Sequence, residues 1–227
     1  MVDFFIINVC PYNLVMSIKG RSLGDMSWRN LVQAIKEMKH YLIAAAATFL
    51  VGAYLGYSEP GQFQFLLDNQ IKQLTDMVNN IGGHEHYQWR LLAFILVNNV
   101  LVSVFMVYSG VMLGIIPLYS LLSNGLIMGY LAHQNVPDKG WGSFILAILP
   151  HGIIELPAFI LACAFGIKFG AIMFKSFFFL FSPTRRAANN AAFIKMLKVS
   201  VPLVIIVALL LMAAALIESM VTLRLVS

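Results

Sequence analysis

A histidine and a glutamate, His151 and Glu155, stand four residues apart near the start of a long apolar stretch that runs from residue 142 to residue 182. Pro150 and Pro157 bracket the pair in the sequence Pro-His-Gly-Ile-Ile-Glu-Leu-Pro-Ala. An ionisable group in hydrocarbon costs roughly 2.5 kcal/mol or more unless it is paired or hydrated. We therefore expect both side chains to face the protein interior or a water pocket, where they would share a hydrogen bond, bind a cation or move a proton.

The two prolines also act on the backbone. Each one removes an amide donor and disrupts the helix that precedes it, so we predict a broken or kinked helix between Pro150 and Pro157. Free carbonyl groups at such a break are tolerated only where protein or water satisfies them. Half-helices of this type build binding sites in transporters, and the alternative is a purely structural kink.

Other polar residues within apolar segments are candidates to join this pair in a polar cluster. As a metal site the set is thin, because zinc usually takes three or four protein ligands and no His-Glu-x-x-His motif is present. A structural cluster, an ion or transport site and a hydrolytic metal centre all stay open, with no cofactor expected and a non-enzymatic protein favoured. The cluster would comprise His151, Glu155, Asn98, Asn99, Asn124 and Glu218, and the metal candidates would be His151, Glu155 and Glu218.

The composition assigns the chain to the membrane. Of its 227 residues 60% are hydrophobic and 11% are charged, whereas soluble proteins carry about 25% charged residues, and the mean hydropathy is +0.83. A soluble domain of this size has too little interior for that much apolar surface, so the bilayer must be the solvent. We predict an all-α, polytopic transmembrane helical bundle. The two cysteines, Cys10 and Cys163, lie far apart, so no cysteine framework is expected.

Continuous apolar windows predict about five spans within a membrane domain that covers residues 41–222. A hydrocarbon core of about 30 Å needs roughly 20 residues of helix, so the two shortest windows would depend on flanking residues or local thinning. The windows are 41–57, 91–116, 117–132, a region within 142–182, and 199–217.

Charge predicts the orientation of these spans. Basic residues dominate the segment before residue 41, and the 183–198 loop carries four basic residues and no acidic one. The 58–90 connection instead has four acidic residues against two basic ones. The positive-inside rule then places the N-terminus and the 183–198 loop in the cytoplasm. The 58–90 connection, the short 134–140 loop and the C-terminus would be extracytoplasmic. Topology accounts for the net charge of +5, so no nucleic-acid partner is expected.

Two segments outside the spans have their own predictions. Residues 1–25 contain a short apolar run but no signal-peptide cleavage pattern, so we expect a poorly ordered leader or an extension from an alternative start. Residues 26–40 predict a cytoplasmic amphipathic helix. In the 58–90 connection, apolar residues at helical spacing predict an extracytoplasmic helix lying at the interface. These apolar residues are Leu67, Ile71, Leu74, Val78 and Ile81.

Small residues recur at every fourth position in several spans. Such faces allow helix backbones to approach closely in lipid. We expect most of them to pack within the molecule, and a homodimer through one face stays open. The pairs are Gly52 and Gly56, Gly110 and Gly114, and Gly125 and Gly129, and the longer series is Ala158, Ala162, Gly166 and Gly170.

The order of these residues resembles the stage II sporulation protein M family. The most specific element is the block His-Gly-x-x-Glu-Leu-Pro-Ala, and the resemblance covers about residues 28–222. It implies a multi-pass helical protein of the plasma membrane, and it does not make His151 or Glu155 catalytic. The residues that carry it are Asn98, Asn99, Gly110, Gly114, Asn124, Gly125, Gly129, the block from His151 to Ala158, Glu218 and Thr222.

The resemblance also implies a function. Founding members of the family act in engulfment during endospore formation, as a membrane scaffold that recruits cell-wall hydrolases. We therefore expect an integral membrane scaffold that binds extracytoplasmic protein partners, such as cell-wall hydrolases, through its 58–90 connection, with the 134–140 turn as a second candidate surface. The alternatives are a transporter or channel for a small solute or ion, using His151 and Glu155, and an intramembrane metal-dependent hydrolase.

Overall fold

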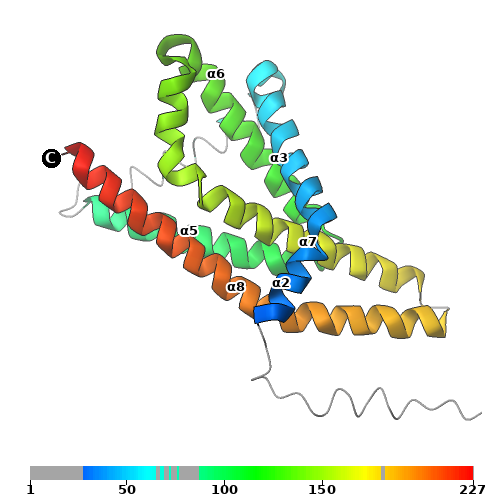
Figure 1. Ribbon diagram of the computed structural model, residues 1–227. Coiled ribbons are helices and arrows are strands. Elements are labelled where there is room, and N and C mark those ends of the chain that lie inside the picture. The colour runs from blue at the N-terminus through cyan, green and yellow to red at the C-terminus, as the bar shows by residue number, and fades with distance from the viewer. Residues whose placement is uncertain are drawn as a thin grey trace, which may run out of the picture.

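A computed structural model describes residues 28–64, 67, 68, 72, 76, 87–179 and 182–226 of the chain. Regular structure in these residues is helical throughout, which confirms the all-α prediction. The leader and most of the predicted helix in the 58–90 connection lie outside the described residues. The elements are α2 (Trp28–Lys36), α3 (Lys39–Ser58), the short 3-10 helix η2 (Pro60–Phe63), α5 (Tyr87–Ser109), α6 (Ile115–Gly152), α7 (Glu155–Phe178) and α8 (Pro183–Val226) (Figure 1).

Several of these helices are long and apolar enough to cross a bilayer, so the prediction of a polytopic membrane bundle is confirmed. Four such segments occur among the described residues, together with a shorter apolar helix, Ala93–Ser109, within α5. The four are Lys39–Ser58, Ile115–Ile148, Glu155–Phe178 and Thr184–Ile217.

The second predicted span, 91–116, ends too late. The described α5 stops at Ser109, and the chain turns before α6 begins at Ile115. Leu113 and Gly114 have φ values of 59° and 76°, which interrupt the helix although every residue in the turn except glycine is apolar. Hydropathy does not detect such a turn, because it measures preference for lipid and not backbone conformation.

The predicted 134–140 loop is shorter than expected. Helix α6 continues to residue 139, and Gly140, with φ 76° and ψ 161°, is the interruption. Two helical limbs follow each other across this glycine, and Figure 1 shows α6 turning back on itself. The first limb has about 25 residues and is roughly 37 Å long, which is enough to cross the hydrocarbon. The second, 141–152, has about 12 residues and reaches roughly 18 Å, about half of the core.

Helix α8 absorbs the segment that was predicted as the 183–198 loop. It has 44 residues, which correspond to about 66 Å of helix, more than twice the thickness of the hydrocarbon. Pro202 lies within it. The basic residues of this segment therefore belong to a continuous helix and not to an open connection.

The helices pack as two parallel pairs crossed by α8. Helix α3 runs parallel to the first limb of α6, and α5 runs parallel to α7, as their glycine contacts show. Helix α8 runs antiparallel to α5 and α7, because Val207 and Leu211 pack near the start of both helices whereas Ser200 reaches Tyr108 near the end of α5. The core also includes α2, whose Leu31 and Ala34 are buried with the following Met38.

Candidate functional site

The break between α6 and α7 separates the two ionisable residues of the Pro150–Pro157 motif. His151 lies in the last turn of α6, and Glu155 is the first residue of α7. The one-turn spacing expected on a continuous helix therefore does not describe this pair, and the ring of His151 is outside the described side chains. Pro157 is the third residue of α7, where an amide has no acceptor within the helix, so it belongs to the start of this helix.

Glu155 receives a hydrogen bond from the neighbouring helix α5. The Asn99 Nδ2 atom donates to its Oε2 atom over 3.2 Å, and both side chains are partly buried. The carboxylate lies in the first turn of α7, where the unpaired amides of a helix start favour negative charge. The contact thus joins α5 to α7 through a hydrogen bond between two polar side chains.

The other predicted members of the cluster are placed differently. Asn98 is exposed, and Asn124 is exposed and donates from Nδ2 to the Ser120 carbonyl oxygen of its own helix over 2.8 Å. The side chain of Glu218 lies outside the described part. The described structure therefore brings Asn99 to Glu155 and leaves Asn98 and Asn124 away from that bond.

A metal site has no support among the described residues. Within them, no group of three or more His, Cys, Asp or Glu side chains lies together as a metal site requires. Two of the three metal candidates, His151 and Glu218, have side chains outside that set.

Helix backbones touch directly at two crossings, where glycines leave no side chain between them. In the first, Gly52 and Gly56 of α3 meet Gly125 and Gly129 of α6. A Cβ atom on Gly56 would lie 2.9 Å from the Leu126 Cα atom, and one on Gly129 would lie 2.8 Å from the Tyr57 amide nitrogen. Real Cβ atoms essentially never come closer than 3.0 Å to such atoms, so only glycine permits this contact.

The second crossing involves the same two helices as the Asn99–Glu155 contact, roughly 16 Å further along each of them. Gly110 and Gly114, at the turn after α5, meet Gly166 and Gly170 of α7. A Cβ atom on Gly110 would lie 2.8 Å from the Gly166 Cα atom, and one on Gly170 would lie 2.7 Å from the Gly114 Cα atom. Ala158 and Ala162, on the same series as these α7 glycines, are also buried. These small residues therefore serve contacts within the molecule.

Three polar contacts between helices were not foreseen from the sequence. The Tyr108 and Ser200 hydroxyl groups lie 3.2 Å apart, joining α5 to α8. Asn189, which is buried in the 183–198 part of α8, donates from Nδ2 to the Ser176 Oγ atom over 2.6 Å. The Lys195 ammonium donates to both carboxylate oxygens of Glu37 over 2.8 and 3.0 Å. No sequence pattern marks these pairs, because their members are far apart along the chain.

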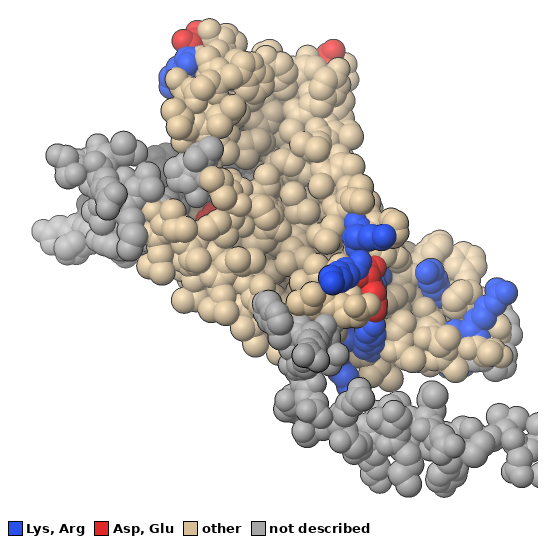
Figure 2. Space-filling view, viewed as in Figure 1, with Lys and Arg blue, Asp and Glu red and all other residues tan. Residues whose placement is uncertain are grey.

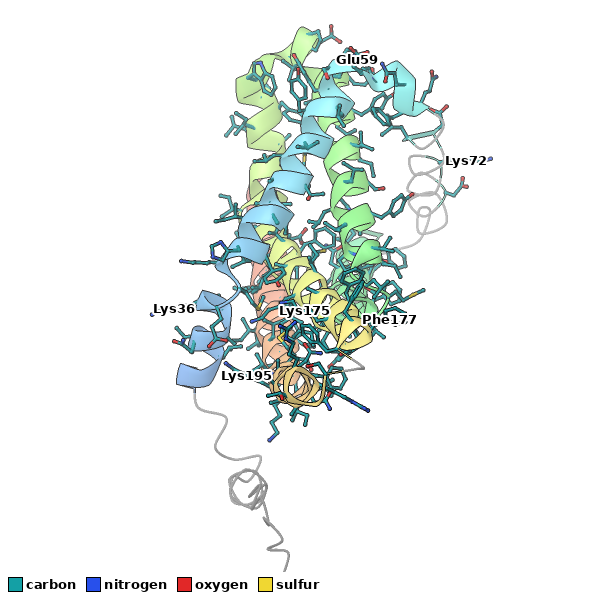
Figure 3. All side chains as sticks on the ribbon, turned by 90° about the vertical axis from the view of Figure 1, so that its right-hand side faces the viewer. Lys36, Glu59, Lys72, Lys175, Phe177 and Lys195 are labelled. Atoms are coloured by element: carbon teal, nitrogen blue, oxygen red, sulfur yellow. The ribbon has the colours of Figure 1, made fainter. Side chains whose placement is uncertain are left out.

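Many of the basic side chains gather at one end of the molecule, and the acidic Glu59 lies at the other end (Figure 3). Figure 3 places Lys36, Lys175 and Lys195 at one end and Glu59 at the other, and Figure 2 shows blue side chains gathered over α2 and the α7–α8 corner. The hydrogen bonds from Lys195 hold the pKa of Glu37 below its usual value. We name this region the basic end, which comprises Lys36, Lys39, Lys175, Arg185, Arg186, Lys195 and Lys198.

Aromatic rings gather at the opposite end, beside the turn of α6. The Tyr57 ring lies 5.9 Å from the His133 ring and 5.5 Å from the Trp141 ring, and Trp141 contacts Phe144. The His133 Nδ1 atom is 2.8 Å from the Tyr57 carbonyl oxygen. This aromatic cluster joins the end of α3 to both limbs of α6.

Comparison with known proteins identifies the family. A family model described as stage II sporulation protein M matches residues 29–223. Over 57 residues the chain is 42% identical to an uncharacterised protein of Methanocaldococcus jannaschii, a match that covers 25% of this chain and 25% of that relative. No solved structure matches. The chain is a multi-pass membrane protein that belongs to the stage II sporulation protein M family.

Proposed function

We propose that the protein is a scaffold of the plasma membrane that binds extracytoplasmic partners, such as cell-wall hydrolases, as founding members of its family do. The observation that carries this proposal is the pair of glycine crossings, at Gly56–Leu126 and Gly110–Gly166. Backbones packed in direct contact make each of the two helix pairs a rigid unit, because close-packed interiors transmit strain, and rigid units suit a scaffold.

Charge supports the orientation. The basic end would face the cytoplasm under the positive-inside rule, which puts the N-terminus inside and the 58–90 connection outside. Helix α8 starts at the basic end and runs antiparallel to α5. Its end therefore lies on the same side as the start of α5, which favours an extracytoplasmic C-terminus.

The end of the molecule opposite the basic end offers a surface for a partner. The end of α3 and the turn of α6 project together at this end of the molecule (Figure 1). Trp141 is 53% exposed and Tyr54 is 70% exposed, and aromatic residues are enriched in protein interfaces. Asp138 and Lys139 add charge at the turn of α6. We propose that the partner binds the connection and this turn together.

Site-specific photocrosslinking in cells tests the proposal. A photoreactive amino acid at position 138, in the turn of α6, should crosslink to a cell-wall hydrolase, whereas one at the exposed position 188 of α8 should not. Replacing residues 60–86 with a flexible linker of equal length should also disperse a fluorescent hydrolase that the intact protein localises. Unchanged localisation, with the variant still inserted in the membrane, would show that the scaffold reading is wrong.

A transporter or channel remains a second candidate, for one specific reason. The second limb of α6 covers only about half of a bilayer core, so Glu155 begins α7 at a break within the apolar region. Half-helix starts of this kind hold ions and substrates in transporters. Liposomes containing the protein should then show ion or solute flux that disappears in Glu155→Gln. Equal flux in protein-free liposomes would end this reading.

A further inference from the structure

The first part of α8 must lie outside the hydrocarbon core. A span of about 20 residues crosses that core, and the apolar window at 199–217 provides it. The preceding residues, 183–198, carry four cations and no acidic residue, yet they are helical. A charged helix that continues directly from a span has to run along the membrane surface or away from it.

This segment is fixed against the end of α7. Buried Asn189 donates to the Ser176 Oγ atom over 2.6 Å and to the Ile172 carbonyl oxygen over 3.1 Å. The rings of Phe169 and Phe193 stack at 5.4 Å with an angle of 16°. We name the unit of residues 169–179 and 182–198 the α7–α8 hairpin. Its two helices are held in one geometry, so the side chains on its surface are presented together.

The surface of the hairpin combines large apolar groups with cations. Phe177 is 71% exposed and Phe178 is 61% exposed, and Figure 3 shows Phe177 at the same end of the molecule as Lys175. The Arg185 guanidinium lies 5.9 Å from the Phe179 ring. Phenylalanine beside lysine and arginine is the composition of elements that lie in the membrane–water interface.

Most of these cations have no acidic counterpart. Lys195 pairs with Glu37, which is the one acidic side chain described at the basic end. Among the described residues, Lys175, Arg186 and Lys198 have no carboxylate partner, and Arg185 contacts a ring. Clusters of cations immediately beside a span attract anionic lipid headgroups.

We propose that the α7–α8 hairpin lies in the membrane–water interface and binds the headgroups of anionic phospholipids. Its phenylalanines enter the boundary of the acyl chains, and Lys175, Arg185, Arg186 and Lys198 contact the phosphate groups. The hairpin faces the leaflet on the side of the basic end. The proposal is independent of the scaffold function, because it concerns the opposite end of the molecule and needs no protein partner.

Native mass spectrometry of the full chain tests it, with detergent micelles that contain equal amounts of phosphatidylglycerol and phosphatidylcholine. The test variant is Arg185→Gln/Arg186→Gln. The matched control is Lys72→Gln/Lys139→Gln, which also removes two exposed cations but away from the hairpin. At low ionic strength the intact protein should retain phosphatidylglycerol in excess. The hairpin variant should lower this preference by up to about 30-fold, since each cation near a surface contributes about a factor of five, and the control should leave it unchanged.

The salt dependence of lipid retention by the intact protein provides a test that needs no variant. The preference for phosphatidylglycerol should fall as sodium chloride rises, because salt screens exposed charges. The proposal is overturned if the intact protein retains both lipids equally. That result would favour an acidic protein as the binding partner of the α7–α8 hairpin. It is also overturned if the two double variants lose the preference to the same extent.

Discussion

Adding one methyl group at Gly129 should loosen the contact between α3 and α6. A Cβ atom there would lie 2.8 Å from the Ala53 carbonyl carbon and from the Tyr57 amide nitrogen. The Ala53 carbonyl oxygen would lie closer still, and ordinary van der Waals contact begins at 3.4 Å, so the two helices would have to separate by more than 0.6 Å locally. Both neighbours are backbone atoms, which cannot move aside as a flexible side chain does.

The expected cost follows from this geometry. Overpacking a well-packed core typically destabilises by about 1–3 kcal/mol. For a chain of this length that corresponds to a decrease of about 2–12 °C in Tm. The matched control is Gly142→Ala, because Gly142 lies in the second limb of the same helix and an added Cβ there meets no atom within 4 Å.

The assay is thermal unfolding of both variants in the same detergent, followed by circular dichroism or by loss of the soluble fraction. Gly129→Ala should unfold below the parent protein, and Gly142→Ala should unfold at the parent temperature or slightly above it, because alanine favours helix. If Gly129→Ala were as stable as Gly142→Ala, the crossing would not be the close contact that the structure describes, and the rigidity argument for the scaffold would fail with it.

Four further predictions concern single contacts. Gly140→Ala should destabilise by about 1–3 kcal/mol in the same assay, because its φ of 76° with ψ of 161° lies in a region that is essentially confined to glycine; an unchanged Tm would mean that the α6 turn can adopt another conformation. Asn99→Leu should destabilise by roughly 1–3 kcal/mol, because Glu155 loses a hydrogen bond, whereas Leu at the exposed Asn98 should have little effect; equal effects would contradict this placement. Asn189→Ala should destabilise by a similar amount, roughly 1–3 kcal/mol, and should raise hydrogen exchange in 183–198, whereas Asn190→Ala, at an exposed neighbour, should do neither. The bond to Lys195 lowers the pKa of Glu37. This bond therefore stabilises the protein at pH values above the usual pKa of a glutamate, and the stabilisation is lost as the pH falls through the lowered pKa. Because both groups are exposed, the contribution should stay below about 1 kcal/mol, and the difference in Tm between the parent and Glu37→Gln should vanish at acid pH and in high salt.

The class of fold is predictable from the sequence because it depends on composition. A chain with 60% hydrophobic residues in continuous runs needs lipid as its solvent, and hydropathy detects this directly. The break between Pro150 and Pro157 was also predictable, since the missing amide of Pro157 acts locally on the helix that precedes it. The end of α5 was not, because the turn at residues 110–114 consists of apolar residues and glycine, whose left-handed conformation leaves no signal in hydropathy.

In the candidate site, too, some features are predictable from the sequence and others are not. Asn98, Asn99 and Asn124 are equivalent in a sequence, because each is an amide within an apolar segment. The structure gives only Asn99 a described bond to Glu155, since the rotation of α5 against α7 determines which amide reaches the carboxylate. The same two helices also meet at Gly110 and Gly166, which are far apart in the chain.

Composition and spacing are thus enough to identify a helical membrane protein, the place where proline interrupts its chain and the faces that are small enough for close packing. The fold was needed to show which small face meets which, that the basic segment 183–198 belongs to α8, and that Asn189 holds that segment to α7. This difference arises because lipid preference and backbone restriction act on each segment separately. Pairing between helices instead depends on complementary surfaces brought together by the whole fold.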